Sequence, residues 1–218
     1  MIAVVGNPIL RRASEPAGNP DLAGTAALAA AAAVRAGAEV QLVGRAGDDP
    51  DGDAVVLALA GAGVGHAAVL RARVRTPVIE PVPDAGVSDD EREPEVADTP
   101  PDPGLEPADV DLALRYLPDF RVVVVAPDVP SDVAEVADRA ASWARATCIR
   151  LVWDAQPPRV PGGGPDRSIV LGAPPTDPDG VFASLVGVLA AAIDRGEDPG
   201  TAFRNVVAAS GWRNAAAE

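Results

Sequence analysis

The chain has 218 residues and a formal net charge of −14, and its composition is 48% apolar but only 3% aromatic. All 18 cationic residues are arginines with no basic face among them, which argues against a nucleic-acid partner and excludes lysine-based phosphate binding or Schiff-base chemistry. The longest apolar run, residues 26–34, is too short to span a bilayer and no signal-peptide pattern precedes it, so we expect a cytoplasmic protein with no membrane partner.

Strand and helix patterns alternate along the chain. The predicted strands cover residues 2–6, 38–44, 67–74, 76–82, 121–127, 149–154 and 168–174, and the predicted helices cover residues 24–35, 53–64, 107–117, 131–147, 181–193 and 200–209. Pro77 places its strand at a sheet edge, and the unbroken valines of residues 122–125 predict a strand covered on both faces. We therefore predict an α/β fold, a mainly parallel sheet flanked by helices, in a single domain spanning 1–218.

The loop "VGRAGDDPDGDAVV" concentrates four aspartates before an apolar run. Asp48 or Asp49 can cap the following helix, with Pro50 at its first position. Asp51 and Asp53 then fall in the first turn, where negative charge complements the helix dipole. The loop lacks the ligand spacing of a calcium-binding EF-hand. We interpret it as a helix start and predict no metal site in the chain.

A long acidic segment interrupts the alternation. From Glu80 to Asp109 the chain carries eleven acids, one arginine and many prolines. Such a composition cannot bury enough apolar surface to order itself. We predict a disordered acidic insertion at about residues 83–106.

The single histidine, the single cysteine and the three tryptophans do not indicate a catalytic or metal site. His66 is the only histidine, and neither a second ligand histidine nor a nucleophile-elbow motif accompanies it. Cys148, the only cysteine, is expected to be an inert, partly buried thiol. Trp143, Trp153 and Trp212 are scattered, and we expect them to pack in the core or in an interface.

Residues 22–64, "LAGTAALAAAAAVRAGAEVQLVGRAGDDPDGDAVVLALAGAGV", contain a helix, a strand and a Gly-rich acidic turn in unbroken succession. They resemble the N-terminal signature of the ribokinase (PfkB-type) family of sugar and nucleoside kinases. The C-terminal "GVLAAAIDRGEDPGTAFRNVVAAS" is similar to the paired helices that follow the family's catalytic motif. The resemblance implies a ribokinase-like fold and, for an intact member, ATP- and Mg²⁺-dependent phosphoryl transfer.

The substrate positions of that family are altered in this chain. The aspartate that binds substrate hydroxyls after the first strand corresponds to Arg11. The asparagine of the Gly-Gly-x-x-x-Asn helix corresponds to Leu28, and of its glycine pair Gly24 remains while Ala23 replaces the other. The resemblance thus implies weakened sugar binding, whereas Arg11 suggests either an anionic ligand or a solvent-exposed cation.

The catalytic motif is altered as well. Alignment of Asp177 to Gly187 with D-T-T-G-A-G-D-x-F-x-G keeps Gly180 but places the general base on Ala183 and an anion-hole glycine on Phe182. Alanine cannot accept a proton, and a bulky residue replaces a glycine where phosphate needs close backbone approach. Asp179 could serve as base only by a displacement of four residues, about one helical turn.

Length supports the same interpretation. Fewer than twenty residues separate "IRLVWDAQPP" from Asp177, where the resemblance implies further strands around the nucleotide. We also expect no lid strands in residues 11–24, so we predict a truncated ribokinase-like fold with the lid absent.

Two functions remain open. The first is a protein that lacks phosphotransfer activity and binds a small metabolite or a protein partner, with Arg11, Gly24 and Gly180 as the binding residues, no catalytic residue and no assigned cofactor. The alternative is an active kinase of a sugar or nucleoside-like substrate that uses ATP and Mg²⁺, with Asp177 or Asp179 as a displaced base. A homodimer is compatible with either function.

Overall fold

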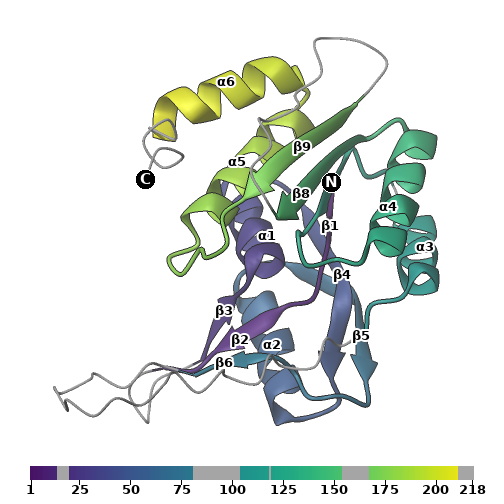
Figure 1. Cartoon of the computed structure of the whole chain (residues 1–218), viewed down its shortest axis with the longest axis vertical. Helices are drawn as coiled ribbons and strands as arrows, with labels where there is room; N and C mark the ends of the chain where they lie inside the picture. The colour runs from purple at the N-terminus through teal and green to yellow at the C-terminus, as the bar shows by residue number, and fades with distance from the viewer. Residues whose placement is uncertain (14–19, 81–103, 118, 154–166, 211–218) are drawn as a thin grey trace, which may run out of the picture.

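The computed structural model describes residues 1–13, 20–80, 104–117, 119–153 and 167–210 (Figure 1). Helices cover both faces of a central sheet, and a small second sheet lies at one end. The strands are β1 (Ile2–Val5), β2 (Ile9–Arg11), β3 (Asp21–Ala23), β4 (Val40–Gly47), β5 (Gly65–Ala72), β6 (Val78–Ile79), β7 (Val122–Val125), β8 (Thr147–Trp153) and β9 (Ser168–Ala173). The helices are α1 (Thr25–Arg35), α2 (Pro50–Gly61), α3 (Pro107–Tyr116), α4 (Ser131–Ala144), α5 (Val181–Asp194) and α6 (Pro199–Ser210).

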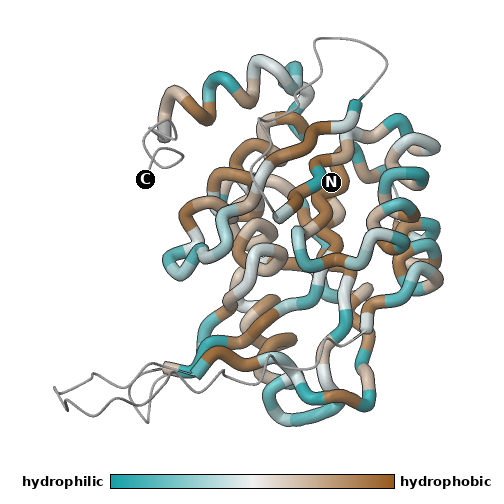
Figure 2. Tube along the Cα trace, viewed as in Figure 1, coloured by the Kyte–Doolittle hydropathy of each residue, from teal (hydrophilic) through white to brown (hydrophobic). Residues whose placement is uncertain are grey.

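The central sheet has the order β5-β4-β1-β7-β8-β9, and every neighbouring pair is parallel. Side chains of β7 alternate between two cores: Val122 and Val124 pack with α1 and α5, whereas Val123 and Val125 pack with α3 and α4. The apolar strands accordingly run through the middle of the molecule in Figure 2. This arrangement confirms the predicted α/β fold with a parallel sheet. Strand β7 is apolar at every position because both of its faces are buried.

Helices α1 and α5 lie side by side on one face of the sheet (Figure 1). Their approach is close because the residues between them are small. A Cβ atom on Gly187 would collide with the carbonyl oxygen of Ala29 and would lie 2.7 Å from the Cβ of Ala32. The alanine-rich sequence of α1 therefore supplies tight packing as well as helix propensity.

The acidic loop is a helix start, as predicted, and Asp49 is the residue that caps α2. Its carboxylate accepts hydrogen bonds from the Gly52 amide at 2.7 Å, the Thr76 amide at 2.8 Å and the Thr76 hydroxyl at 2.6 Å. Burial raises the pKa of Asp49, but the hydrogen bonds from Thr76 and Gly52 and the charge of Arg71 outweigh that effect, so the pKa is lowered overall. Asp49 thus joins the start of α2 to the segment before β6.

The second sheet corrects the expectation that the lid is absent. Strand β2 pairs antiparallel with β3 and parallel with β6. This sheet lies beyond the carboxyl end of β1 (Figure 1). The prediction that no strands fit in residues 11–24 was wrong because β2 and β3 have three residues each and because their sheet is completed by β6, which follows β5 in sequence. The edge position predicted for Val78–Ile79 is confirmed.

Only the end of the predicted acidic insertion lies among the described residues. Residues 83–103 lie outside the described residues, but Gly104 to Glu106 belong to the fold. Leu105 is buried in the α3–α4 core. Arg45 of β4 forms ion pairs with Glu106 at 3.3 Å and Asp109 at 2.7 Å. An apolar anchor and a paired cation therefore order the end of an otherwise acidic segment.

Some boundaries also differ from the prediction. Helix α2 begins at Pro50, as its capping signals predict, although its apolar pattern starts only after Asp53. Helix α4 ends at Ala144, three residues earlier than expected, so Thr147 begins β8. Arg145 stops α4 because it adopts a left-handed conformation with φ 56°. Between Trp153 and Asp177 the described residues form a single strand, β9. None of the described helices is long and apolar enough to cross a membrane.

Candidate functional site

The N-terminus of α5 lies beside β2 and the start of α1, close to where the first strand ends. Arg11 on β2 reaches across to the turn that precedes α5, where its Nη2 atom donates a hydrogen bond to the carbonyl oxygen of Pro178 at 2.7 Å. Arg11 is half-buried, and its guanidinium is directed to this backbone carbonyl. Arg11 thus holds the turn before α5 against β2.

The two predicted glycines lie in the same patch. Gly24 precedes α1 with φ 78°, and a Cβ atom there would lie 2.8 Å from Cδ1 of Ile9. Gly180 precedes α5 with φ 66°, and a Cβ atom there would lie 2.7 Å from Cδ1 of Leu28. The structure therefore brings Arg11, Gly24 and Gly180 together, and the side chains of Ile9 and Leu28 fill the space beside the two glycines.

The first amides of α5 are bound by the chain's own carboxylate. Asp177 Oδ1 accepts a hydrogen bond from the Phe182 amide at 3.1 Å, and Asp177 Oδ2 accepts one from the Ala183 amide at 2.9 Å. Helix N-terminal amides carry partial positive charge and ordinarily attract an anion. Here that anion is a side chain of the turn itself. We refer to Asp177, Gly180, Phe182 and Ala183 with Arg11, Gly24 and Leu28 as the α5 N-terminal site.

Of the other motif positions, only Asp179 carries a carboxylate. Ala183 is fully buried and Phe182 is 7% exposed, and both belong to the core beneath the helix. Asp179 is exposed and has no hydrogen bond or ion pair within the described part of the chain. The sequence suggested Asp177 only as a displaced base and gave no signal that its carboxylate binds the first turn of α5, because Asp177 lies three residues before Gly180, the N-cap residue.

The remaining candidates lie elsewhere. His66 is on the edge strand β5, with Nδ1 3.2 Å from the Val64 carbonyl oxygen. Cys148 is buried in β8, and burial together with the neighbouring Asp138 raises the pKa of its thiol. Among the described residues no group of three or more His, Cys, Asp and Glu side chains is arranged to hold a metal ion. Neither His66 nor Cys148 contributes to the α5 N-terminal site.

No family model matches the chain, and no curated protein matches it in sequence. Among solved structures, Arabidopsis thaliana ribokinase complexed with ribose and ATP superposes with a TM-score of 0.61 and 16% identity over 96% of this chain and 90% of that chain. Phosphofructokinase-2 from Escherichia coli in complex with fructose-6-phosphate superposes with a TM-score of 0.59 and 15% identity over 96% of this chain and 92% of that chain.

A more distant neighbour has the same architecture. Fructokinase from Xylella fastidiosa with bound ATP gives a TM-score of 0.51 and 18% identity over 94% of this chain and 64% of that chain. At such identities the likeness concerns the path of the backbone alone. The order of the six parallel strands and the superposition agree that this chain has the ribokinase-like fold.

Proposed function

We propose that this protein uses the ribokinase-like scaffold for binding and does not transfer phosphoryl groups. The single observation that carries the proposal is the carboxylate of Asp177 on the amides of Phe182 and Ala183. In a kinase of this fold those amides would have to face the negative charge of the transferred phosphate. A phosphate at this place would have to displace Asp177 and would meet a like charge at close range.

The position of the general base supports the same proposal. Ala183 offers only a buried methyl group, and no proton can be transferred to it. Asp177, the first alternative base, has both carboxylate oxygens engaged in hydrogen bonds to the helix. The ATP and Mg²⁺ that an active member would use therefore find the Phe182 and Ala183 amides already bonded to Asp177, and an alanine at the position of the base.

The binding role is assigned to the same patch. Arg11, Gly24 and Gly180 connect the second sheet with the starts of α1 and α5. Ligands of open parallel sheets bind beyond the carboxyl ends of the strands, and this patch lies there. A small metabolite or a protein partner bound at this place would contact the second sheet and the α5 turn together.

The test compares the native chain with two variants. We expect no binding in calorimetric titrations with ATP and Mg²⁺ at millimolar concentration, and no turnover over a panel of sugars and nucleosides. Asp177→Ala frees the two amides, so inorganic phosphate should bind this variant more tightly than it binds the native chain. Asp179→Ala is the matched control, since it removes the same charge two residues away without freeing an amide.

Two results would contradict the proposal. Turnover by the native chain that is lost on Asp179→Asn or Asp177→Asn would establish the alternative, an active kinase with a displaced base. Equal phosphate affinity for Asp177→Ala and Asp179→Ala would show that the carboxylate of Asp177 does not compete with an anion.

A further inference from the structure

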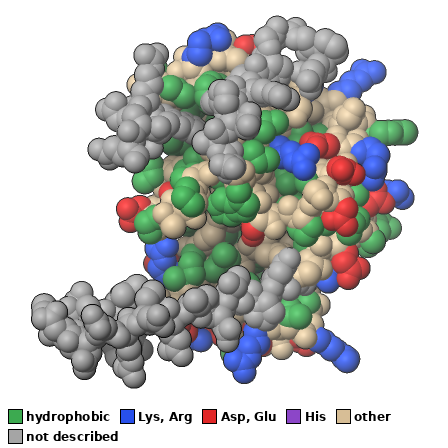
Figure 3. Space-filling view, in the orientation of Figure 1, with side chains coloured by type: hydrophobic (Ala, Val, Ile, Leu, Met, Phe, Trp, Pro, Cys, Tyr) green, Lys and Arg blue, Asp and Glu red, His purple; other side chains and the backbone are tan. Residues whose placement is uncertain are grey.

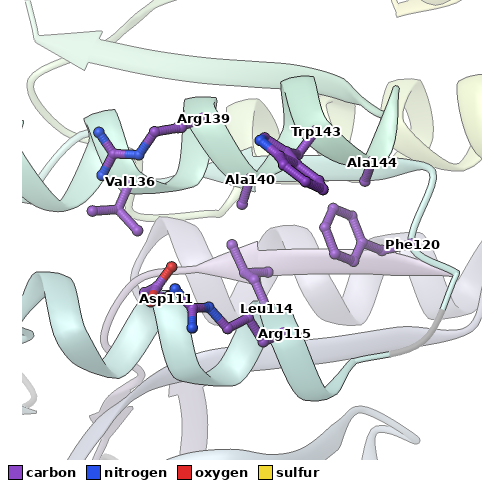
Figure 4. A pocket seen from close by; sticks show the side chains of 9 residues that line it. All are labelled: Asp111, Leu114, Arg115, Phe120, Val136, Arg139, Ala140, Trp143 and Ala144. Atoms are coloured by element: carbon purple, nitrogen blue, oxygen red, sulfur yellow. Dashed lines mark ion pairs between the residues drawn. The ribbon is translucent and has the colours of Figure 1, made fainter.

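A groove separates α3 from α4 on the face of the sheet opposite to α1 and α5 (Figure 4). Its volume is about 540 Å³, within the range of small-molecule sites. Leu114, Phe120 and Val136 form its floor and are 4–7% exposed, as members of the α3–α4 core. The groove therefore has a rigid apolar floor.

One end of this groove is aromatic. Trp143 of α4 is 89% exposed, and its indole lies on the same side of the groove as the ring of Phe120 (Figure 4). Of the two places predicted for Trp143, the core is thereby excluded, and packing in an interface stays a prediction. A tryptophan has a large apolar surface, and tryptophan side chains are on average highly buried in folded proteins. The indole of Trp143 therefore presents a surface on which a planar apolar group can stack, with the Phe120 ring in the floor beside it.

The other end is charged. Arg139 lies one helical turn before Trp143 and projects on the same side of α4, and Arg115 and Asp111 face it from α3 (Figure 4). Arg115 pairs with Asp111 at 2.7 Å. Within the described part of the chain no acid lies within salt-bridge distance of Arg139. This end therefore carries a net positive charge, although acidic and basic side chains are interspersed on the neighbouring surface (Figure 3) and the whole chain has a net charge of −14.

We infer that this groove is a second binding site, which takes a small organic anion with a planar apolar body. The ring system would stack on Trp143 beside Phe120, and the carboxylate, sulfonate or phosphate would pair with Arg139. The charge at one end selects an anion over a neutral compound of the same shape. The inference does not depend on the loss of phosphoryl transfer, because the groove and the α5 N-terminal site lie on opposite faces of the sheet.

The probe is 8-anilinonaphthalene-1-sulfonate, a planar aromatic anion, and its neutral counterpart is N-phenyl-1-naphthylamine. Fluorescence titration of the full chain should show saturable binding of the sulfonate with loss of tryptophan emission. Arg139→Gln should weaken the sulfonate about tenfold, as expected for one lost charge-assisted contact, and should leave the neutral probe within about twofold. Trp143→Leu should weaken both probes. Circular dichroism checks that each variant is folded.

Two matched controls lie outside the groove. Trp153→Leu removes a half-exposed tryptophan at the end of β8, and Arg204→Gln removes an exposed arginine on α6. Neither should change the affinity of either probe. The inference is overturned if Trp143→Leu leaves sulfonate binding intact, or if Arg139→Gln affects both probes equally. It is also overturned if the native chain sediments as a dimer with Trp143 protected from acrylamide quenching, since a second copy would then cover the groove.

Discussion

The carboxylate of Asp177 lies 2.9 Å from the backbone nitrogen of Ala183 in the first turn of α5. The side chain of Asp177 thus binds a backbone amide six residues further along the chain. The contact closes the N-terminus of α5 with a charge that belongs to the chain. Both bonded amides, those of Phe182 and Ala183, lie in the first turn of α5.

The cap should contribute measurably to stability. Asp177→Ala leaves the Phe182 and Ala183 amides without their acceptor and should lower the free energy of unfolding by about 1 kcal/mol, as for other helix caps. Urea unfolding measures the change. Asp179→Ala, which removes an exposed carboxylate without a partner among the described residues, should differ from the native chain by less than about 0.5 kcal/mol. Equal losses in the two variants would show that Asp177 does not cap α5.

The contact between α1 and α5 should tolerate no added atom at Gly187. A methyl group there meets the carbonyl oxygen of Ala29, so Gly187→Ala should lower the unfolding free energy by about 1 to 3 kcal/mol, as overpacking does. Gly61→Ala at the end of α2 is the matched control, because no atom lies within 4 Å of the added Cβ. It should leave stability unchanged or raise it by up to about 1 kcal/mol. A stabilised Gly187→Ala would contradict the close approach of the helices.

The link between Asp49 and Thr76 should stabilise the start of α2. The buried Thr76 hydroxyl donates to Asp49 and accepts from the Gly47 amide at 2.9 Å. Thr76→Val keeps the shape of the side chain but leaves both partners short of a bond, so the unfolding free energy should fall by about 1 to 3 kcal/mol. Thr176→Val, at an exposed loop position, should have little effect. If Thr76→Val leaves the unfolding free energy unchanged, a water molecule replaces the hydroxyl in the variant.

Asp194 should make stability depend on acidic pH. Its side chain is 8% exposed and pairs with the Met1 ammonium at 2.9 Å and with Arg121 at 3.0 Å. Burial raises the pKa of Asp194, but the hydrogen bonds and charges of Met1 and Arg121 outweigh burial and lower the pKa below 3.8 overall. The pKa of Asp194 is lower in the folded chain than in the unfolded chain. The ionised carboxylate therefore contributes its full stabilisation above the unfolded pKa, and this stabilisation is lost as the pH falls through the folded pKa.

The corresponding variant is Asp194→Asn. At pH 7 the free energy of unfolding of this variant should be about 3 kcal/mol lower than that of the native chain, as for a broken buried ion pair. The difference from the native chain should shrink as the pH is lowered from about 5 towards 2. Thermal unfolding across that range measures both effects, and Glu135→Gln on the exposed face of α4 serves as the control. A difference that does not change with pH would mean that packing, and not the ionised carboxylate, accounts for the loss.

The order of the main elements could be predicted from the sequence because it depends on local patterns. The valines of β7 indicate burial on both faces, and the glycines and prolines mark the turns. The cap of α2 was narrowed to Asp48 or Asp49, and only the contact with Thr76, 27 residues away, selects Asp49. The second sheet escaped prediction because β2 and β3 are too short to give a periodic signal and β6, which completes their sheet, is distant in sequence.

By itself the sequence determined the parallel α/β architecture and the helix start at Pro50. The roles that the kinase resemblance implies for the positions of Arg11 and Ala183 stay predictions. Periodicity, capping and motif spacing are properties of neighbouring residues, and they can be judged without the fold. Only the tertiary structure decided that Arg11 holds the Pro178 carbonyl and that Asp177 binds the α5 amides. It also decided that Trp143 and Arg139 line a groove against α3. Each of these depends on how side chains and helices meet in space, which no local pattern specifies.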